Sequence, residues 1–219
     1  MTTAIGLDIG SYSIKLIELA RDGDRVGLVA AGSVPMPPRA LTSSLQADTD
    51  TEAVAVAIRK LMKDAGCKSR NVTIALPESK VFTRVIEVPQ LSQRELASAI
   101  KWEAEQYIPL PLDQVNVDYT VLREAKDTGT NKMEVLLVAA PKSLIERYLT
   151  IAELAELTTV GAETEIIATA RAVARSIPTV KTVMAVSLGS QTTDIAVLKG
   201  GVLAFTRSVG SAGEAITRS

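Results

Sequence analysis

Two copies of one short pattern, rich in glycine and hydroxyl residues, could together hold an anion. The first copy runs from Asp8 to Leu19 and the second from Ser187 to Leu198, at a constant offset in the chain. In each copy an apolar stretch leads to a glycine, small hydroxyl residues follow, and an alternating stretch comes next. This order is typical of a β-hairpin with the glycine in its turn. Glycine lets backbone amides approach a phosphate closely, and Ser and Thr hydroxyls add donors.

The recurrence of the pattern carries more weight than either copy. One hairpin of this kind is weak support for a phosphate site, because glycine and serine are ordinary turn residues. Two copies at equivalent places in two half-domains favour phosphate binding, and two facing turns would hold a polyphosphate from both sides. Two members of the pattern have plainer alternatives: Asp8 could cap its own turn, and Lys15 could be a solvated strand residue.

The composition excludes several classes of protein. The chain has 219 residues, of which 47% are hydrophobic, enough for the core of one large domain or two small ones. Its 24 basic and 25 acidic residues are spread along the sequence, which disfavours binding to nucleic acid or anionic lipid. No apolar run approaches 18 residues and the N-terminus has no signal-peptide pattern, so we expect a cytosolic protein without membrane insertion.

The residue types also limit the chemistry. The chain has no histidine, which excludes Ser-His-Asp and Cys-His arrangements and zinc sites that need histidine. Its single cysteine, Cys67, follows Gly66 at a probable helix end and is interpreted as structural. Any reaction must therefore use carboxylates, hydroxyls, backbone amides and a metal such as Mg²⁺.

The pattern of apolar residues predicts a meander, a small insert and a second meander. The elements of the first part are strands at 4–9, 13–20, 26–34 and 72–76 and a helix at 51–65. The insert is predicted to hold strands at 81–88, 115–122 and 134–139 and helices at 92–108 and 144–157. A helix at 164–176 leads back, and strands at 183–186, 195–198 and 202–205 follow.

The first helix of the insert has a clear signature. Ser92 and Glu95 form a capping box and Pro109 ends the helix. One face carries Leu96, Ile100, Ala104 and Tyr107, which leaves Trp102 on the opposite side. Trp102 either packs under a neighbouring strand or loop, or is an exposed aromatic anchor for a partner.

These features together resemble the FtsA/PilM branch of the actin-like ATPase superfamily, and within it the PilM family of type IV pilus assembly proteins. The resemblance rests on Asp8-Ile9-Gly10-Ser11-Tyr12-Ser13-Ile14-Lys15, on the second Gly-Ser-x-Thr-Thr-Asp-Ile hairpin and above all on Ile100-Lys101-Trp102-Glu103-Ala104-Glu105-Gln106-Tyr107-Ile108-Pro109. It implies an α/β, actin-like (ribonuclease H-like) fold with a small α+β insert and the start of a second actin-like half. The implied division is 1–80 for the first domain, 81–160 for the insert, 161–181 for the return and 182–219 for the incomplete second domain.

The resemblance also implies a function. Such proteins are cytoplasmic, nucleotide-binding adaptors that bind the N-terminal peptide of the inner-membrane protein PilN, sit at the inner membrane through that partner, and link it to the pilus motor ATPase. ATP and Mg²⁺ are the implied cofactors. Asp8 would hold Mg²⁺ through water, and the residues that would contact the phosphates are Gly10, Ser11, Ser13, Lys15, Gly189, Ser190, Thr192 and Thr193.

The sequence departs from the family pattern in two respects. Ser187 stands where the family has an aspartate, which removes an anionic partner for hydrated Mg²⁺ and argues against ATP hydrolysis; Asp194 is not expected to substitute. The chain is also shorter than the family's members, so we expect the last meander to expose apolar surface and residues 1–178 to be the more soluble product. An FtsA-like division protein and a small-molecule kinase of the same superfold are the alternatives.

Overall fold

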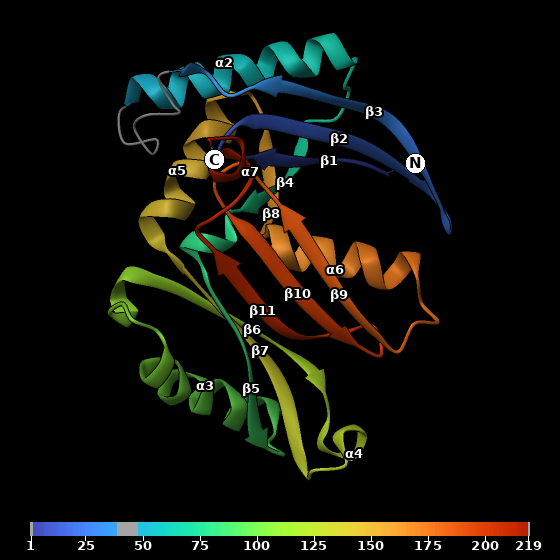
Figure 1. Ribbon diagram of the computed structural model, residues 1–219, viewed down its shortest axis with the longest axis vertical. Helices are drawn as coiled ribbons and strands as arrows, with labels where there is room; N and C mark the ends of the chain where they lie inside the picture. Colours follow the sequence, from blue (N-terminus) through green and yellow to red (C-terminus); the bar gives the residue numbers. More distant parts are fainter. Residues whose placement is uncertain (1, 39–47, 219) are drawn as a thin grey trace. The chain divides into compact units, whose positions relative to one another are not determined.

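The computed structural model describes residues 2–38 and 48–218 (Figure 1). The chain forms two compact units. Unit 1 comprises Met1–Pro77 and Leu144–Glu165, and unit 2 comprises Glu78–Ser143 and Ile166–Ser219. The chain therefore crosses between the units at residues 77–78, 143–144 and 165–166.

Unit 1 is built on a five-stranded sheet of order β3-β2-β1-β4-β8. The first three strands form the antiparallel meander that the sequence predicts, whereas β4 and β8 run parallel to β1. The strands are β1 (Thr2–Ile9), β2 (Ser13–Asp22), β3 (Arg25–Pro35), β4 (Asn71–Leu76) and β8 (Thr158–Thr164). Mixed pairing of this kind needs helical crossovers between the parallel strands.

One helix, α2 (Asp48–Ala65), runs along this sheet (Figure 1). Its apolar stripe is buried, as are the inward residues of β1 and β2. The packing is close at Gly32 of β3, where a Cβ would lie 2.8 Å from Cδ1 of Leu61. Gly66 follows the helix with φ +73°, the left-handed conformation typical of a helix end. The predicted helix and its glycine stop are confirmed.

A buried carboxylate ties β2 to the loop before β4. Glu18 is 0% exposed, and its two oxygens accept the backbone N–H groups of Lys68 at 2.8 Å and Ser69 at 3.0 Å. The loop is therefore fixed to the sheet by two charge-assisted hydrogen bonds. A second tie joins the helices of unit 1, since Arg59 of α2 donates to the carbonyl of Leu154 at the end of α5 (Lys142–Leu154).

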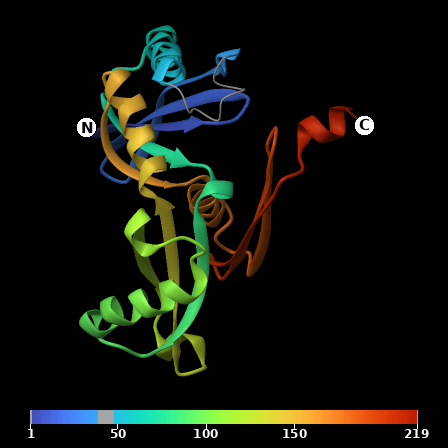
Figure 2. The same ribbon diagram turned by 90° about the vertical axis from the view of Figure 1, so that its left-hand side faces the viewer.

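Unit 2 contains residues 78–143, which are called the insert from here on although the sequence predicts an insert of 81–160; their antiparallel sheet has the order β5-β7-β6. The strands are β5 (Phe82–Pro89), β6 (Val115–Arg123) and β7 (Lys132–Pro141), with the short helices η1 (Glu78–Lys80), η2 (Leu112–Gln114) and α4 (Ala125–Thr128). The helix α3 (Gln93–Tyr107) covers one face of this sheet (Figure 2), and its predicted capping box between Ser92 and Glu95 is present.

The remainder of unit 2 is α6 (Glu165–Ser176), the three-stranded antiparallel sheet β11-β10-β9, and α7 (Gly213–Arg218). The strands are β9 (Thr182–Leu188), β10 (Thr193–Lys199) and β11 (Val202–Val209). Both the helix and the meander agree with the sequence prediction. Apolar side chains on the outer face of this sheet are exposed, with Met184 at 66%, Val186 at 54% and Leu188 at 59%. The expected exposed apolar surface is therefore present.

Two features of the fold differ from the prediction made from the sequence. The strand β8 was not predicted, because only the helices on either side of it have clear apolar periodicity. The insert also belongs to the same compact unit as the last sheet, whereas most of α5 and β8 belong to the same unit as the first sheet. The four-part division at residues 80, 160 and 181 stays a prediction. In the described part of the chain, no helix is both long and apolar enough to cross a membrane.

Candidate functional site

The turn between β1 and β2, residues 10–13, is tight and depends on its glycine. The amide of Gly10 donates to the carbonyl of Ser13 at 3.1 Å, and Asp8 lies opposite Lys15 in the hairpin register. A Cβ on Gly10 would lie 3.0 Å from the Ser13 carbonyl oxygen. A side chain at this position would therefore crowd the backbone of its own turn.

The turn between β9 and β10, residues 189–192, repeats this geometry. The amide of Gly189 donates to the carbonyl of Thr192 at 2.9 Å, and a Cβ on Gly189 would lie 2.8 Å from that carbonyl oxygen. In the register, Ser187 lies opposite Asp194, at the places that Asp8 and Lys15 hold in the first hairpin. The structure confirms that the repeated pattern forms two equivalent hairpins.

The hydrogen bonds inside the turns decide which groups remain for a ligand. The amides of Gly10 and Gly189 are used within the turns, so the glycines contribute space rather than donors. Among the described residues, the hydroxyls of Ser11 and Ser13 have no hydrogen-bond partner, and the same holds for Ser190 and Thr192. These four hydroxyls are the free donors that the two turns present.

The second turn is braced by the segment that follows β11. Thr193 donates through Oγ1 to the carbonyl of Ser211 at 2.7 Å. The amides of Gly213 and Glu214 donate to the carbonyls of Gly189 at 3.1 Å and Ser190 at 2.9 Å. Thr193 and the start of α7 thus hold the turn in place, which makes Thr193 a support of the turn as well as a predicted phosphate contact.

The charges beside the first turn form one row across the sheet. Lys15 Nζ lies 2.8 Å from Asp8 Oδ2, while Asp8 Oδ1 is buried without a hydrogen-bond partner in the described part of the chain. The parallel register then places Ala75 beside Asp8 and Glu163 beside Ala75. The small Ala75 separates two carboxylates that project from the same face of the sheet.

A buried tyrosine of unit 1 lies close to Asp8. Tyr148 of α5 is buried, and its pKa is raised first by that burial and then by the negative charges of Glu165 and Asp8. Its phenol therefore stays protonated and can donate a hydrogen bond. Sequence reasoning missed Glu163, Glu165 and Tyr148, because only strand pairing and helix packing bring them near the first turn.

The second hairpin carries a carboxylate in a different place from the first. Asp194 is only 5% exposed and lies between Ser187 and Ser208 on the neighbouring strands. Within the described residues, Asp194 Oδ1 and Ser208 Oγ are both buried without a hydrogen-bond partner. Ser187 leaves its own strand without a carboxylate, but the opposite strand provides one. The offset of the repeat, which aligns Asp194 with Lys15, was the signal for this.

The residues near the first turn fit a hydrated Mg²⁺ better than a metal held directly by protein. The described residues contain no group of three or more His, Cys, Asp or Glu side chains that could hold a metal. Asp8 has one buried oxygen without a partner, which suits a contact to a metal-bound water. Mg²⁺ commonly binds through one or two carboxylates and substrate phosphates while keeping several waters.

The insert presents its tryptophan to solvent. Leu96, Ile100 and Ala104 are buried against the sheet, and Tyr107 lies half-buried with the guanidinium of Arg84 4.2 Å from its ring centre. Trp102, on the opposite side of α3, is 73% exposed. The structure therefore contradicts packing under a neighbouring segment, and the role of Trp102 as an anchor for a partner stays a prediction.

The paired glycine hairpins and the mixed sheet of unit 1 define a protein of the actin-like ATPase fold. A protein with that fold and unknown function from Bacteroides thetaiotaomicron matches 96% of this chain and 71% of its own, at 12% identity and a TM-score of 0.52. The cytoplasmic domain of EpsL, an inner membrane component of the type II secretion system of Vibrio cholerae, matches at 14% identity and a TM-score of 0.60, over 95% of this chain and 71% of its own.

The chain belongs to the family of type IV pilus assembly protein PilM, whose model matches residues 6–219. A solved PilM-PilN type IV pilus biogenesis complex contains a chain that is 27% identical, with a TM-score of 0.84. The match covers 98% of this chain and 63% of that one. This chain thus spans less than two thirds of the length of that relative.

Proposed function

We propose that this chain acts as the nucleotide-binding part of a cytoplasmic adaptor in type IV pilus assembly. The observation that carries the proposal is the pair of equivalent turns, each with a glycine that a side chain would crowd and with free hydroxyl donors. Such turns are suited to the close approach of phosphate oxygens. Their occurrence in a member of the PilM family favours ATP over a simple anion.

The chemistry available at the turns favours binding over rapid turnover. Ser11, Ser13, Ser190 and Thr192 would donate to phosphate oxygens, and Lys15 would add a positive charge. Asp8 would orient Mg²⁺ through water. Phosphoryl transfer also needs a positioned water and a base. Lys15 already neutralises one oxygen of Asp8, so we propose that nucleotide mainly sets the shape of the adaptor.

The proposed partner is the N-terminal cytoplasmic peptide of the inner-membrane protein PilN, which would keep the adaptor at the inner membrane. The solved PilM-PilN complex supports this partner for the family member that it contains. We propose Trp102 as one contact, because a large exposed aromatic side chain is a common anchor at interfaces. The pilus motor ATPase is a further proposed partner.

Peptide titration tests the adaptor role directly. A PilN N-terminal peptide is titrated by calorimetry into the chain, with and without ATP and Mg²⁺. We expect saturable binding that Trp102→Ala weakens about tenfold or more, equivalent to roughly 1.4 kcal/mol. Trp102→Phe keeps an aromatic ring and Gln106→Ala alters a neighbouring exposed position, so both serve as controls. Absence of saturable binding by the wild-type chain under both conditions would contradict the adaptor role.

A further inference from the structure

The insert shares a hydrophobic core with the sheet that carries the second turn. Both belong to unit 2, and apolar residues on the face of the insert sheet away from α3 pack against α6 and β10. Leu136 of β7 packs with Ile166 of α6 and Leu198 of β10 in one buried cluster. Half-buried residues from both sheets complete it: Val85, Leu122, Val138 and Ala185. Because cores are close-packed, a displacement of either sheet requires the other to adjust.

The edges of these two sheets also meet. Thr206 of β11 donates through Oγ1 to the carbonyl of Thr83 in β5 at 3.4 Å. The contact joins the edge strand of the second meander to an edge strand of the insert. A polar contact therefore supplements the apolar one.

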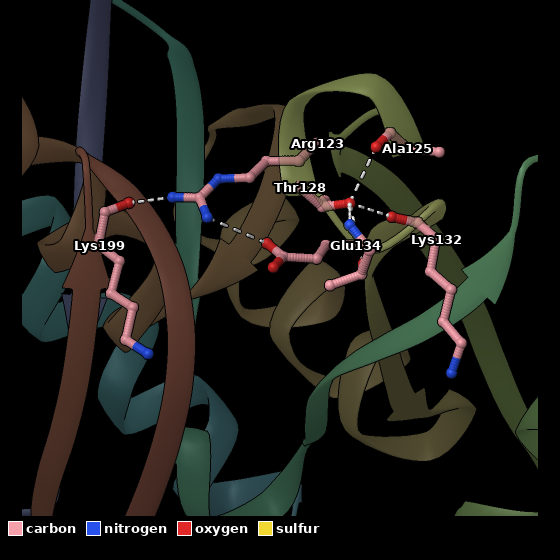
Figure 3. Close-up of polar contacts among 7 residues, drawn as sticks. Arg123, Ala125, Thr128, Lys132, Glu134 and Lys199 are labelled. Atoms are coloured by element: carbon pink, nitrogen blue, oxygen red, sulfur yellow. Dashed lines mark hydrogen bonds and ion pairs between the residues drawn. The ribbon is translucent and has the colours of Figure 1, made fainter.

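Arg123 provides the third and most specific link. It lies at the end of β6, and its guanidinium donates to the carbonyl of Lys199 at the far end of β10, as Figure 3 shows. The same group lies 3.7 Å from the carboxylate of Glu134 in β7, and the side chains of both residues are about one quarter exposed. Arg123 thus joins the insert sheet to the turn between β10 and β11.

The turn that receives Arg123 is shaped for a close approach. Gly200 and Gly201 follow Lys199 with φ +59° and +77°, values that favour glycine. The amide of Gly200 donates to the carbonyl of Lys181 at 2.7 Å, and a Cβ on Gly200 would lie 3.5 Å from Nη2 of Arg123. The guanidinium therefore rests against a backbone turn that is fixed on its other side.

We infer that Arg123 is a positioning residue that couples the insert to the second turn. One strand, β10, carries Lys199 at one end and Thr193 and Asp194 at the other, so fixing its far end fixes the strand that enters the turn. The consequence is that a peptide bound on the insert would change the affinity of the second turn for phosphate. This consequence rests on the proposed function. Such coupling is reciprocal between the two ligands.

Hydrogen exchange on the full chain without ligands tests the link itself. We expect Arg123→Gln to speed exchange of the Gly200 amide and of amides in β10, whereas Arg94→Gln, at an exposed arginine of the same insert, leaves both unchanged. Arg123→Lys keeps the charge near Glu134 but lacks the planar fork, so we expect an intermediate effect. Faster exchange confined to β6 in the Arg123→Gln chain, with β10 unchanged, would overturn the inference.

A linkage measurement separates the inference from the proposed function. The affinity for MgATP is measured with and without saturating PilN peptide, and the ratio of the two dissociation constants reports the coupling. We expect a ratio of about fivefold or more in the wild-type chain and in Arg94→Gln, and a ratio near one in Arg123→Gln. If both ligands bind the wild-type chain and the ratio is one, the inferred coupling between the two sites is wrong. If neither ligand binds, the proposed function is wrong, and the hydrogen-exchange result still tests whether Arg123 links the insert to β10.

Discussion

Glu18 is a buried carboxylate in the strand that follows the first turn, and replacing it gives a prediction with a defined size. Its two carboxylate oxygens accept the amides of Lys68 and Ser69, and the side chain is fully buried. Glu18→Gln has nearly the same shape but offers one acceptor and one NH₂ donor. One of the two backbone amides would then face a donor instead of an acceptor.

The magnitude follows from the cost of an unpaired buried group. A buried donor without an acceptor costs about 1–3 kcal/mol, so we expect Glu18→Gln to lower the free energy of unfolding by that amount. Glu18→Ala leaves both amides unpaired and removes packing atoms, so its cost is roughly twice as large. Because β2 also carries Lys15, part of the effect should appear as a loosened first turn.

Urea unfolding followed by circular dichroism measures the effect. Glu153→Gln, at an exposed position of α5 in the same unit, makes the same chemical change without a buried partner and is the matched control. Surface substitutions of this kind usually change stability by less than about 0.5 kcal/mol. If Glu18→Gln and Glu153→Gln unfold alike within that margin, the two hydrogen bonds do not stabilise the loop as argued.

Three other outcomes follow from the structure. The pKa of the Cys67 thiol is raised first by burial and then by the charge and hydrogen bond of Glu18. Little thiolate therefore forms at pH 8, and the thiol should react slowly with iodoacetamide. Glu18→Gln should increase that rate. Met184→Lys should reduce aggregation measured by light scattering without lowering the melting temperature, because that side chain is exposed. Truncation after residue 178 should instead reduce the protection of Leu136 and its neighbours in hydrogen exchange, since it removes Leu198 from their shared core.

The last of these outcomes bears on the expectation that residues 1–178 are the more soluble product, which stays a prediction. The sequence predicts this greater solubility because the final meander has an apolar outer face. That face is indeed exposed, but apolar residues on the inner face of the same meander pack against the insert. Truncation therefore exchanges one exposed apolar surface for another, a consequence of long-range packing that periodicity along the chain does not report.

Local patterns predicted most of the elements in this chain. The amphipathic stripe of α3, its capping box and the two glycine hairpins are encoded within about fifteen residues each, and all three are present. The strand β8 was missed because Thr158–Thr164 holds few apolar residues at strand spacing and pairs only at the sheet edge. Its formation depends on the parallel strand β4, which lies far away in sequence.

The residues of the candidate site could be predicted where they belong to one contiguous motif. They could not be predicted where their position depends on the register of strand pairing. The glycines and hydroxyls of both turns were found directly. The neighbours of Asp8 were not, since Glu163 reaches that row through two strand pairings and Tyr148 through helix packing. Asp194 lay within the motif, but its place opposite Ser187 follows only from the pairing of β9 with β10.

Calorimetric titration of MgATP into the wild-type chain, Gly10→Ala and Gly189→Ala tests most directly the proposal that each turn contributes to nucleotide binding. The added methyl groups would lie 3.0 Å and 2.8 Å from carbonyl oxygens of their own turns, so each variant should distort one turn only. We expect saturable binding by the wild-type chain and a loss of about tenfold or more in each variant, with Gly27→Ala, at a position with open space, as the control. Unchanged affinity in either turn variant would contradict the proposed role of that turn in nucleotide binding.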